Sequence, residues 1–269
     1  MSASYSPTRR IGEGVRLVQP ARPLSSMMEV QHTFRTAERR SMGRANLFAL
    51  LCTLILAAYS LVLLRPGTVW AGLPVAAAAD RVGILFAFGL IYLLRLNVMA
   101  RWLLPRELAQ EELTVVPLWV LSILASYSLG AIRLTEEMTT LAMGVSILLY
   151  VLGSWLNSWS ELQRKSWKAM PENKGRCYTR GLFSLSRNIN YFGDCVLFAG
   201  WAVASGCWWN AWAPVTMAAS FHFHHIPDKE AYLSKRYAAD WPAYQRRVKA
   251  FVPSSADRAL PGARTLGAC

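Results

Sequence analysis

The sequence predicts an all-α fold, a multi-pass transmembrane helical bundle of about six spans with both termini on the cytosolic side. Three observations lead to this prediction. Of the 269 residues, 54% are hydrophobic, more than a soluble domain usually contains. Long apolar segments carry almost no charge, and the net charge of +13 collects in the loops and tails between them. Basic loops beside apolar segments are typical of membrane proteins and argue against a nucleic-acid-binding protein.

Charged tails are predicted at both ends of the chain. Residues 1–45 are rich in Arg and Ser and contain three prolines. They lack the apolar segment of a secretory signal, and three glutamates among them count against a transit peptide. We therefore expect a disordered basic N-terminal tail over 1–45, one membrane domain over 46–253, and a C-terminal tail over 254–269.

Four apolar segments are each long enough to cross a hydrocarbon core of ~30 Å as a helix. They are Asn46–Leu64, Val82–Leu104, Val115–Ile132 and Thr140–Leu156. A fifth apolar stretch, Phe192–Phe223, is broken in its middle by the sequence SGCWWNAWAP. We interpret this stretch as a hairpin of two short helices, which makes spans five and six.

The distribution of cations orients these spans. Loops after the first, third and fifth spans carry Arg65, Arg81 and Arg133 between them. The opposite side receives eight arginines of the N-terminal tail and eight Lys and Arg between Lys229 and Arg264. Because cytosolic loops of membrane proteins carry the excess of Lys and Arg, this side is predicted to be cytosolic.

The first polar block, residues 163–171, follows the fourth span. Arg164 and Lys168 are four residues apart, so on a helix that extends beyond the span they share one face. Two cations on one face at a membrane boundary can hold a phosphate. Binding of lipid headgroups or simple anchoring explains the block as well, and the block alone favours these explanations.

The second polar block, residues 181–194, reads GLFSLSRNINYFGD and runs into an apolar segment. Half-buried polar groups at a membrane edge need partners, and a bound anionic cofactor would supply them. The alternative is that Asp194 caps the helix that follows and Tyr191 anchors the interface. That alternative leaves Arg187 and its two neighbouring asparagines unexplained.

In the third polar block, 228–253, five residues recur at helical offsets: Glu230, Leu233, Tyr237, Tyr244 and Val248. This pattern predicts an amphipathic helix on the cytosolic leaflet, whose other face is free to line a site. The cysteines and histidines of the chain add no metal site. No two of the five cysteines have CxxC spacing, and His222 and His225, three residues apart, lack the remaining ligands.

Together, the three polar blocks resemble the steroid 5-alpha-reductase and sterol-reductase superfamily, most of all its uncharacterised branch with a steroid-reductase-like C-terminal domain. The resemblance covers residues 150–253, with the blocks in the family's order and spacing. The second block follows the family pattern except that Asn188-Ile189 replaces His-Pro. Matching residues are Gln163, Arg164, Trp167, Lys168, Pro171, Gly181, Leu182, Phe183, Ser186, Arg187, Asn190, Tyr191, Phe192, Gly193, Asp194, Glu230, Leu233, Tyr237, Tyr244 and Pro253.

The resemblance implies NADPH as the cofactor, bound from the cytosolic side, and location in the endoplasmic reticulum membrane. It implies reduction of a C=C bond in a hydrophobic sterol-, steroid- or enoyl-lipid-like substrate. The implied cofactor-binding residues are Arg164, Lys168, Arg187, Asn190, Tyr191, Asp194, Glu230, Tyr237 and Tyr244.

A proton donor is implied in the second span. Tyr92, with Arg95 three residues later, fits a Tyr-x-x-Arg element of the family, so Tyr92 is the implied catalytic acid. Animal steroid reductases pair such a Tyr with a Glu, but this chain has no Glu between Glu38 and Glu107. A 3-oxo-steroid is therefore not the expected substrate.

Two alternatives remain open from the sequence. Isoprenylcysteine carboxyl methyltransferases share parts of the second and third blocks and bind S-adenosylmethionine. They usually carry paired glutamates where this chain has Lys229-Glu230. The second alternative is a non-catalytic membrane protein that keeps the fold, and the missing Glu supports it.

Overall fold

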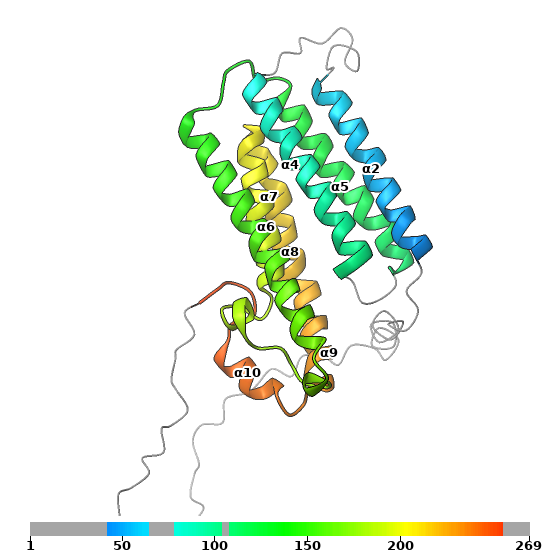
Figure 1. Ribbon diagram of the computed structural model, residues 1–269. Helices are drawn as coiled ribbons and strands as arrows, with labels where there is room; N and C mark the ends of the chain where they lie inside the picture. Colours follow the sequence, from blue (N-terminus) through cyan, green and yellow to red (C-terminus); the bar gives the residue numbers. More distant parts are fainter. Residues whose placement is uncertain (1–41, 65–77, 104–107, 255–269) are drawn as a thin grey trace, which may run out of the picture.

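A computed structural model describes residues 42–64, 78–103 and 108–254 of the chain. Within these residues the regular structure is helical throughout, without strands. The long helices run side by side as one bundle (Figure 1). They are α2 (Met42–Leu64), α4 (Ala79–Val98), α5 (Gln110–Ala131), α6 (Thr140–Lys168) and α7 (Ile189–Ser205). Three shorter helices follow, α8 (Trp212–Ser220), α9 (Ile226–Arg236) and α10 (Trp241–Arg247). The helical turns are η1 (Met99–Leu103), η2 (Pro171–Asn173), η3 (Gly181–Ser184), η4 (Trp208–Ala211) and η5 (Phe221–His225).

The predicted multi-pass helical bundle is confirmed. Four of the described helices are long and apolar enough to cross a membrane, namely Gly43–Leu64, Ala79–Leu103, Gln110–Ala131 and Thr140–Lys168. Their outward faces carry many exposed large apolar side chains, as expected for contact with lipid. The predicted tails fall almost entirely outside the described residues.

The apolar stretch after the second polar block forms the predicted hairpin. Its first helix, α7, ends at Gly206, whose φ of +75° lies in the left-handed region that favours glycine. A Cβ at this position would lie 2.4 Å from Nη1 of Arg81. The returning helix is longer than predicted, because α8 continues through the π-helical η5 into α9.

An aromatic cluster fills the centre of the bundle. Trp201 of α7 is fully buried, and the ring centroids of Tyr59, Tyr92, Tyr127 and Tyr150 lie 5.6 to 6.4 Å from it. Three of these tyrosines each donate the hydroxyl to a backbone carbonyl of another helix, at 2.9, 3.1 and 2.6 Å. Edge-on aromatic contacts together with satisfied hydroxyls hold five helices around one side chain.

Helices α6 and α7 approach each other so closely that glycine is required between them. A Cβ at Gly153 would lie 2.2 Å from the backbone N of Leu197, and one at Gly193 would lie 2.7 Å from the backbone N of Asn157. Small residues that let backbones touch are a usual basis of helix association in membranes. This contact places the last turns of α6 beside the first turns of α7.

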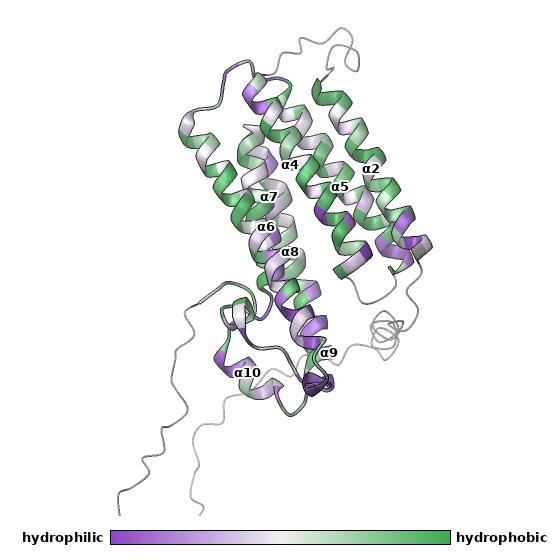
Figure 2. Ribbon diagram, in the orientation of Figure 1, coloured by the Kyte–Doolittle hydropathy of each residue, from purple (hydrophilic) through white to green (hydrophobic). Residues whose placement is uncertain are grey.

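The end of the bundle where α6 ends and α7 begins is called the basic end here. Lys165 donates to the carbonyl of Trp102, and Arg44 donates to the carbonyl of Leu108 at 3.1 Å, so η1 and the starts of α2 and α5 lie at this end too. Hydrophilic residues gather there, and α9 and α10 lie beyond it (Figure 2). The extension of α6 carries Arg164 and Lys168, as the first polar block predicts.

The prediction of a single amphipathic helix over the third polar block is wrong. The backbone leaves the α conformation at Tyr237, with φ −123° and ψ +45°, and a new helix begins at Trp241. Pro242 lies in the first turn of α10, where its missing N–H is not needed. Two short helices can therefore fold back onto the basic end.

The glycine contact between α6 and α7 can be tested by substitution. We expect Gly153→Ala to lower the free energy of unfolding by about 1 to 3 kcal/mol, because the added methyl group meets the α7 backbone. The measurement is unfolding of the detergent-solubilised protein. Gly144→Ala in the same helix is the control, since no atom lies within 4 Å of its Cβ. Equal stability of the two variants would contradict this packing.

Candidate functional site

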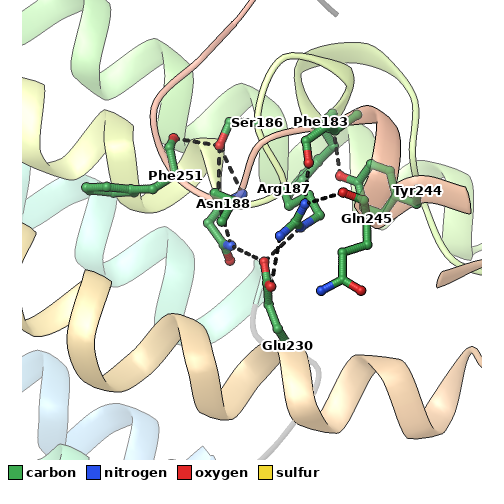
Figure 3. A network of polar contacts seen from close by, with 10 residues as sticks. Phe183, Ser186, Arg187, Asn188, Glu230, Tyr244, Gln245 and Phe251 are labelled. Carbon is green, nitrogen blue, oxygen red and sulfur yellow. Dashed lines mark hydrogen bonds and ion pairs between the residues drawn. The ribbon is translucent and has the colours of Figure 1, made fainter. Parts of the chain in front are cut away.

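The three polar blocks meet at the basic end of the bundle. The second block packs between the end of α6 and the third block, and α9 and α10 close over it (Figure 3). The sequence separations are large, but the polar groups of the blocks contact one another directly. This region therefore contains the candidate site.

Arg187 links the second polar block to the third. Its Nε and Nη2 donate to the two carboxylate oxygens of Glu230 at 2.8 and 2.9 Å, which makes a bidentate ion pair. Its Nη1 donates to the carbonyl of Gln245 at 2.9 Å and also to that of Val248. Both side chains of the pair are largely buried. The guanidinium therefore fixes α9 and the end of α10 relative to the loop before α7.

Further contacts hold the same junction together. Ser186 donates its hydroxyl to the carbonyl of Phe251 at 2.6 Å. Asn188 donates its amide to the carbonyl of Ala250 at 2.8 Å. The hydroxyl of Tyr244 donates to the carbonyl of Phe183 at 2.7 Å. Three predicted cofactor residues, Arg187, Glu230 and Tyr244, thus come together here, and the polar groups of each are engaged by protein.

The interpretation of Asp194 as a helix cap is wrong. Helix α7 begins at Ile189, so Asp194 lies in its second turn. Its Oδ1 accepts from Nη2 of Arg95 at 2.6 Å, and its Oδ2 accepts from Nδ2 of Asn157 at 2.9 Å. This carboxylate joins α4, α6 and α7 near the basic end, where an unpaired charge in an apolar bundle would be costly.

The helices joined by this ion pair also carry buried polar atoms without a protein partner. Among the described residues, Nη1 of Arg95, Oγ of Ser154 and Oδ1 of Asn190 lack a hydrogen bond. Ser154 lies about one turn before Asn157, and the carbonyl of Asn190 accepts from that asparagine at 3.0 Å. Buried polar groups in native proteins are nearly always satisfied. A polar ligand at this place would satisfy both the donor and the acceptors.

Tyr92 lies next to the same ion pair. Its ring centroid is 5.3 Å from the guanidinium carbon of Arg95 and 5.3 Å from the ring of Phe198. The predicted acid and the predicted cofactor residue Asp194 are therefore brought together through Arg95. Tyr92 is buried within the bundle, beneath the groups of the basic end.

Three cations act electrostatically on the thiol of Cys177. Burial, with the nearby carboxylate of Asp240, raises the pKa of Cys177 to about 11, and the charges of Lys168, Arg164 and Lys229 act against this rise. Lys168 donates to the hydroxyl of Tyr237 at 2.9 Å. Arg164 pairs with Glu161. The region around Arg164, Lys168 and Lys229 is called the mouth of the candidate site here.

Lys229 is the cation of this mouth whose pKa lies well below its ordinary value. Burial, together with the nearby positive charge of Arg164, lowers the pKa of Lys229 to about 7. Its Nζ lies 4.5 Å from the ring centroid of Tyr191, and that ring stacks on Phe221 with centroids 4.5 Å apart. The amine is therefore held against an aromatic surface beside a second cation.

The part of the chain that contains this site matches a known protein family. Residues 95–248 match the model of a family described as "Protein of unknown function (DUF1295)", more than half of the chain. The chain belongs to this family. It is a membrane family similar to the steroid reductases, as the three polar blocks predict. The match runs from Arg95 to Val248, so it contains the three ion pairs described above.

A fungal protein is also similar to part of the chain. The probable O-methyltransferase ustE of Ustilaginoidea virens is 35% identical over 71 residues, which are 26% of this chain. These residues span about a quarter of the length of that relative. The similarity is thus to one segment of the fungal protein.

Sequence reasoning missed several residues of this DUF1295 family site. Lys229 appeared only as a departure from a pair of glutamates, and Arg95 only as part of the Tyr92 element. Asn157 and Glu161 were not predicted. An amide inside an apolar span marks a function by default, so Asn157 offered a usable signal.

The Arg187–Glu230 pair can be tested through stability. We expect Glu230→Ala to lower the free energy of unfolding by about 3 kcal/mol, because it leaves a buried guanidinium without its partner. Thermal unfolding in detergent and protease cleavage after residue 228 are the measurements. Glu172→Ala, an exposed position, is the control. If both variants unfold alike, the pair does not hold the junction.

Proposed function

We propose that this protein is a membrane-embedded, NADPH-dependent reductase of a C=C bond in a hydrophobic substrate that is sterol-, steroid- or enoyl-lipid-like. The observation that carries the proposal is the charge of the mouth at the basic end. Arg164, Lys168 and Lys229 converge there, while the charge of Glu230 is already taken up by Arg187. Within the described mouth, Glu161 and Asp240 are the acids that oppose these three cations.

This charge suits a polyanionic cofactor. The phosphates of NADPH would be held by Lys168, Arg164 and Lys229, since ammonium and guanidinium groups bind phosphate through charge-assisted hydrogen bonds. The aromatic rings of Tyr191 and Tyr237 beside these cations offer flat apolar surface for the rest of the dinucleotide. Membership of a family similar to the steroid reductases supports the same cofactor.

The groups below the mouth suit the reacting part of the cofactor and the substrate. Nη1 of Arg95 and Oδ1 of Asn190 are a donor and an acceptor that a carboxamide or hydroxyl can satisfy. When bound, NADPH supplies the hydride that reduces the C=C bond. Tyr92 is proposed to donate the proton that the reduced bond requires. Arg95 places a positive charge beside the Tyr92 ring, which would stabilise the phenolate left behind. The apolar bundle excludes water from these groups.

The substrate would reach this site from the lipid. Exposed apolar residues cover the outer face of the bundle, and a hydrophobic molecule dissolved in the membrane can pass between helices without crossing water. The cofactor would arrive from the opposite direction, at the basic end. The endoplasmic reticulum, which the resemblance implies, stays a prediction.

A second candidate function is S-adenosylmethionine-dependent methyl transfer, and the similarity to a probable O-methyltransferase favours it. Two features support the reductase over this candidate. S-adenosylmethionine carries a sulfonium cation, which a mouth of three cations repels. Lys229 also stands where the methyltransferases usually carry an acid, and its partner in that pair, Glu230, is engaged by Arg187.

Cofactor titration tests the proposal. The purified protein in detergent should bind NADPH in the micromolar range or tighter, as a rough expectation for a cofactor site. We expect Lys168→Ala and Asp194→Ala to weaken binding roughly ten-fold, which corresponds to about 1.4 kcal/mol. Lys235→Ala, an exposed cation of α9, is the control. Tight binding of S-adenosylmethionine without a response to NADPH would support the methyltransferase instead, and binding of neither would support a non-catalytic protein.

Lys229 predicts a pH dependence of NADPH binding. The amine is charged below about pH 7 and neutral above it, and the cofactor phosphates favour the charged form. Affinity contributed by Lys229 is therefore present at low pH and is lost as the pH rises through 7. Lys229→Arg keeps the charge at every pH and should abolish this loss, whereas Lys235→Arg should keep it. Identical pH profiles for wild type and Lys229→Arg would rule out this role.

A further inference from the structure

A separate pocket lies between the loop after α6 and helix α10. Its volume is about 280 Å³, and its lining includes Cys177 but none of the three cations of the mouth. Arg176 and Arg180 of the loop and Arg247 of α10 line it. Of the nine residues predicted to bind the cofactor, Tyr244 alone lines this pocket.

The pocket has an excess of positive charge. Its lining holds three guanidinium groups and one carboxylate, that of Asp240. Among the described residues, the side chains of Arg176, Arg180 and Arg247 make no ion pair or hydrogen bond with protein. Asp240 is partly occupied, since its Oδ2 accepts from the backbone N of Cys177 at 3.0 Å. Three exposed guanidinium groups around one space create a positive potential that favours an anion between them.

The walls of the pocket are held in place by contacts of their own. Trp167, on the last turn of α6, packs against Tyr178 with ring centroids 5.3 Å apart, and its carbonyl accepts from Asn173 at 2.8 Å. Tyr244 is fixed by its hydrogen bond to the carbonyl of Phe183. The bond between Cys177 and Asp240 joins the loop to the turn before α10. The loop and α10, which carry the lining, are therefore held together by contacts that do not involve the three arginines.

We propose that this pocket binds a phosphate monoester, at a site that adjoins the proposed cofactor site but does not use its three cations. Guanidinium groups present planar, forked donors that match phosphate oxygens, and a dianion balances the charge excess. The volume exceeds that of a bare phosphate ion, so it accommodates a phosphate with a small group attached. The aromatic walls formed by Trp167 and Tyr244 contact that group.

The phosphate monoester could belong to a phospholipid headgroup or to a soluble phosphate ester, and two assays distinguish these ligands. The full-length protein is reconstituted in phosphatidylcholine nanodiscs and titrated calorimetrically with glycerol 3-phosphate. In parallel, nanodiscs that also contain phosphatidic acid are analysed for lipid retained by the protein. If a substitution in the pocket weakens binding of glycerol 3-phosphate, the source is a soluble ester. If it lowers the amount of phosphatidic acid retained, the source is a lipid headgroup.

Arg247→Gln is the test variant, and Arg246→Gln is its matched control, because both arginines are exposed in α10 and Arg247 lines the pocket. We expect Arg247→Gln to lower binding of one of the two probes at least ten-fold, and Arg246→Gln to leave it unchanged. Arg176→Gln should repeat the loss from the other wall. The affinity for NADPH should be the same in all three variants.

Three results would overturn the proposal. The first is that wild type binds neither probe more tightly than Arg247→Gln does. The second is an equal loss in Arg246→Gln, which would indicate attraction by general surface charge. The third is a loss of affinity for NADPH without a loss for NADH in Arg247→Gln, which would make the pocket part of the cofactor site. The separate NADPH titration keeps this result distinct from failure of the proposed function.

Discussion

The bidentate ion pair between Arg187 and Glu230 is the interaction on which the basic end depends. It joins the loop before α7 to α9, and the remaining guanidinium hydrogen bonds capture the end of α10. Neighbouring residues of a helix point about 100° apart. With Glu230 held by Arg187, Lys229 is turned toward Arg164 and Tyr191. The charge of the mouth therefore follows from a pair whose own charges are engaged with each other.

The same principle operates deeper in the bundle. Asp194 is held by Arg95 and Asn157, and these contacts require α4, α6 and α7 to meet closely. The glycines at Gly153 and Gly193 permit that approach. The close backbone contact thus permits the buried ion pair to form. Near that pair remain unpaired polar atoms that a ligand can satisfy. Tyr92 lies at the inner end of this series, beside Arg95.

Local patterns predicted well those features that depend on local composition. Lengths of apolar sequence gave the membrane helices, and the four-residue spacing of Arg164 and Lys168 placed both on the extension of α6. The wrong predictions concerned helix ends. Asp194 resembled a cap because it precedes an apolar run, but its partner Arg95 is 99 residues away in the sequence. The third polar block resembled one helix because its offsets persist across the turn at Tyr237.

The sequence by itself determined that this is a helical membrane protein, which end is basic, and which polar blocks belong together, because hydropathy, charge and spacing are properties of the chain. The tertiary structure alone decided which predicted residues satisfy one another. Arg187, Glu230 and Tyr244 are engaged by protein groups, whereas Lys229, Arg95 and Asn190 present charge or unpaired atoms to the site. The reason is physical: the worth of a charge depends on what lies around it in space, and the neighbours that decide it are far apart in the sequence.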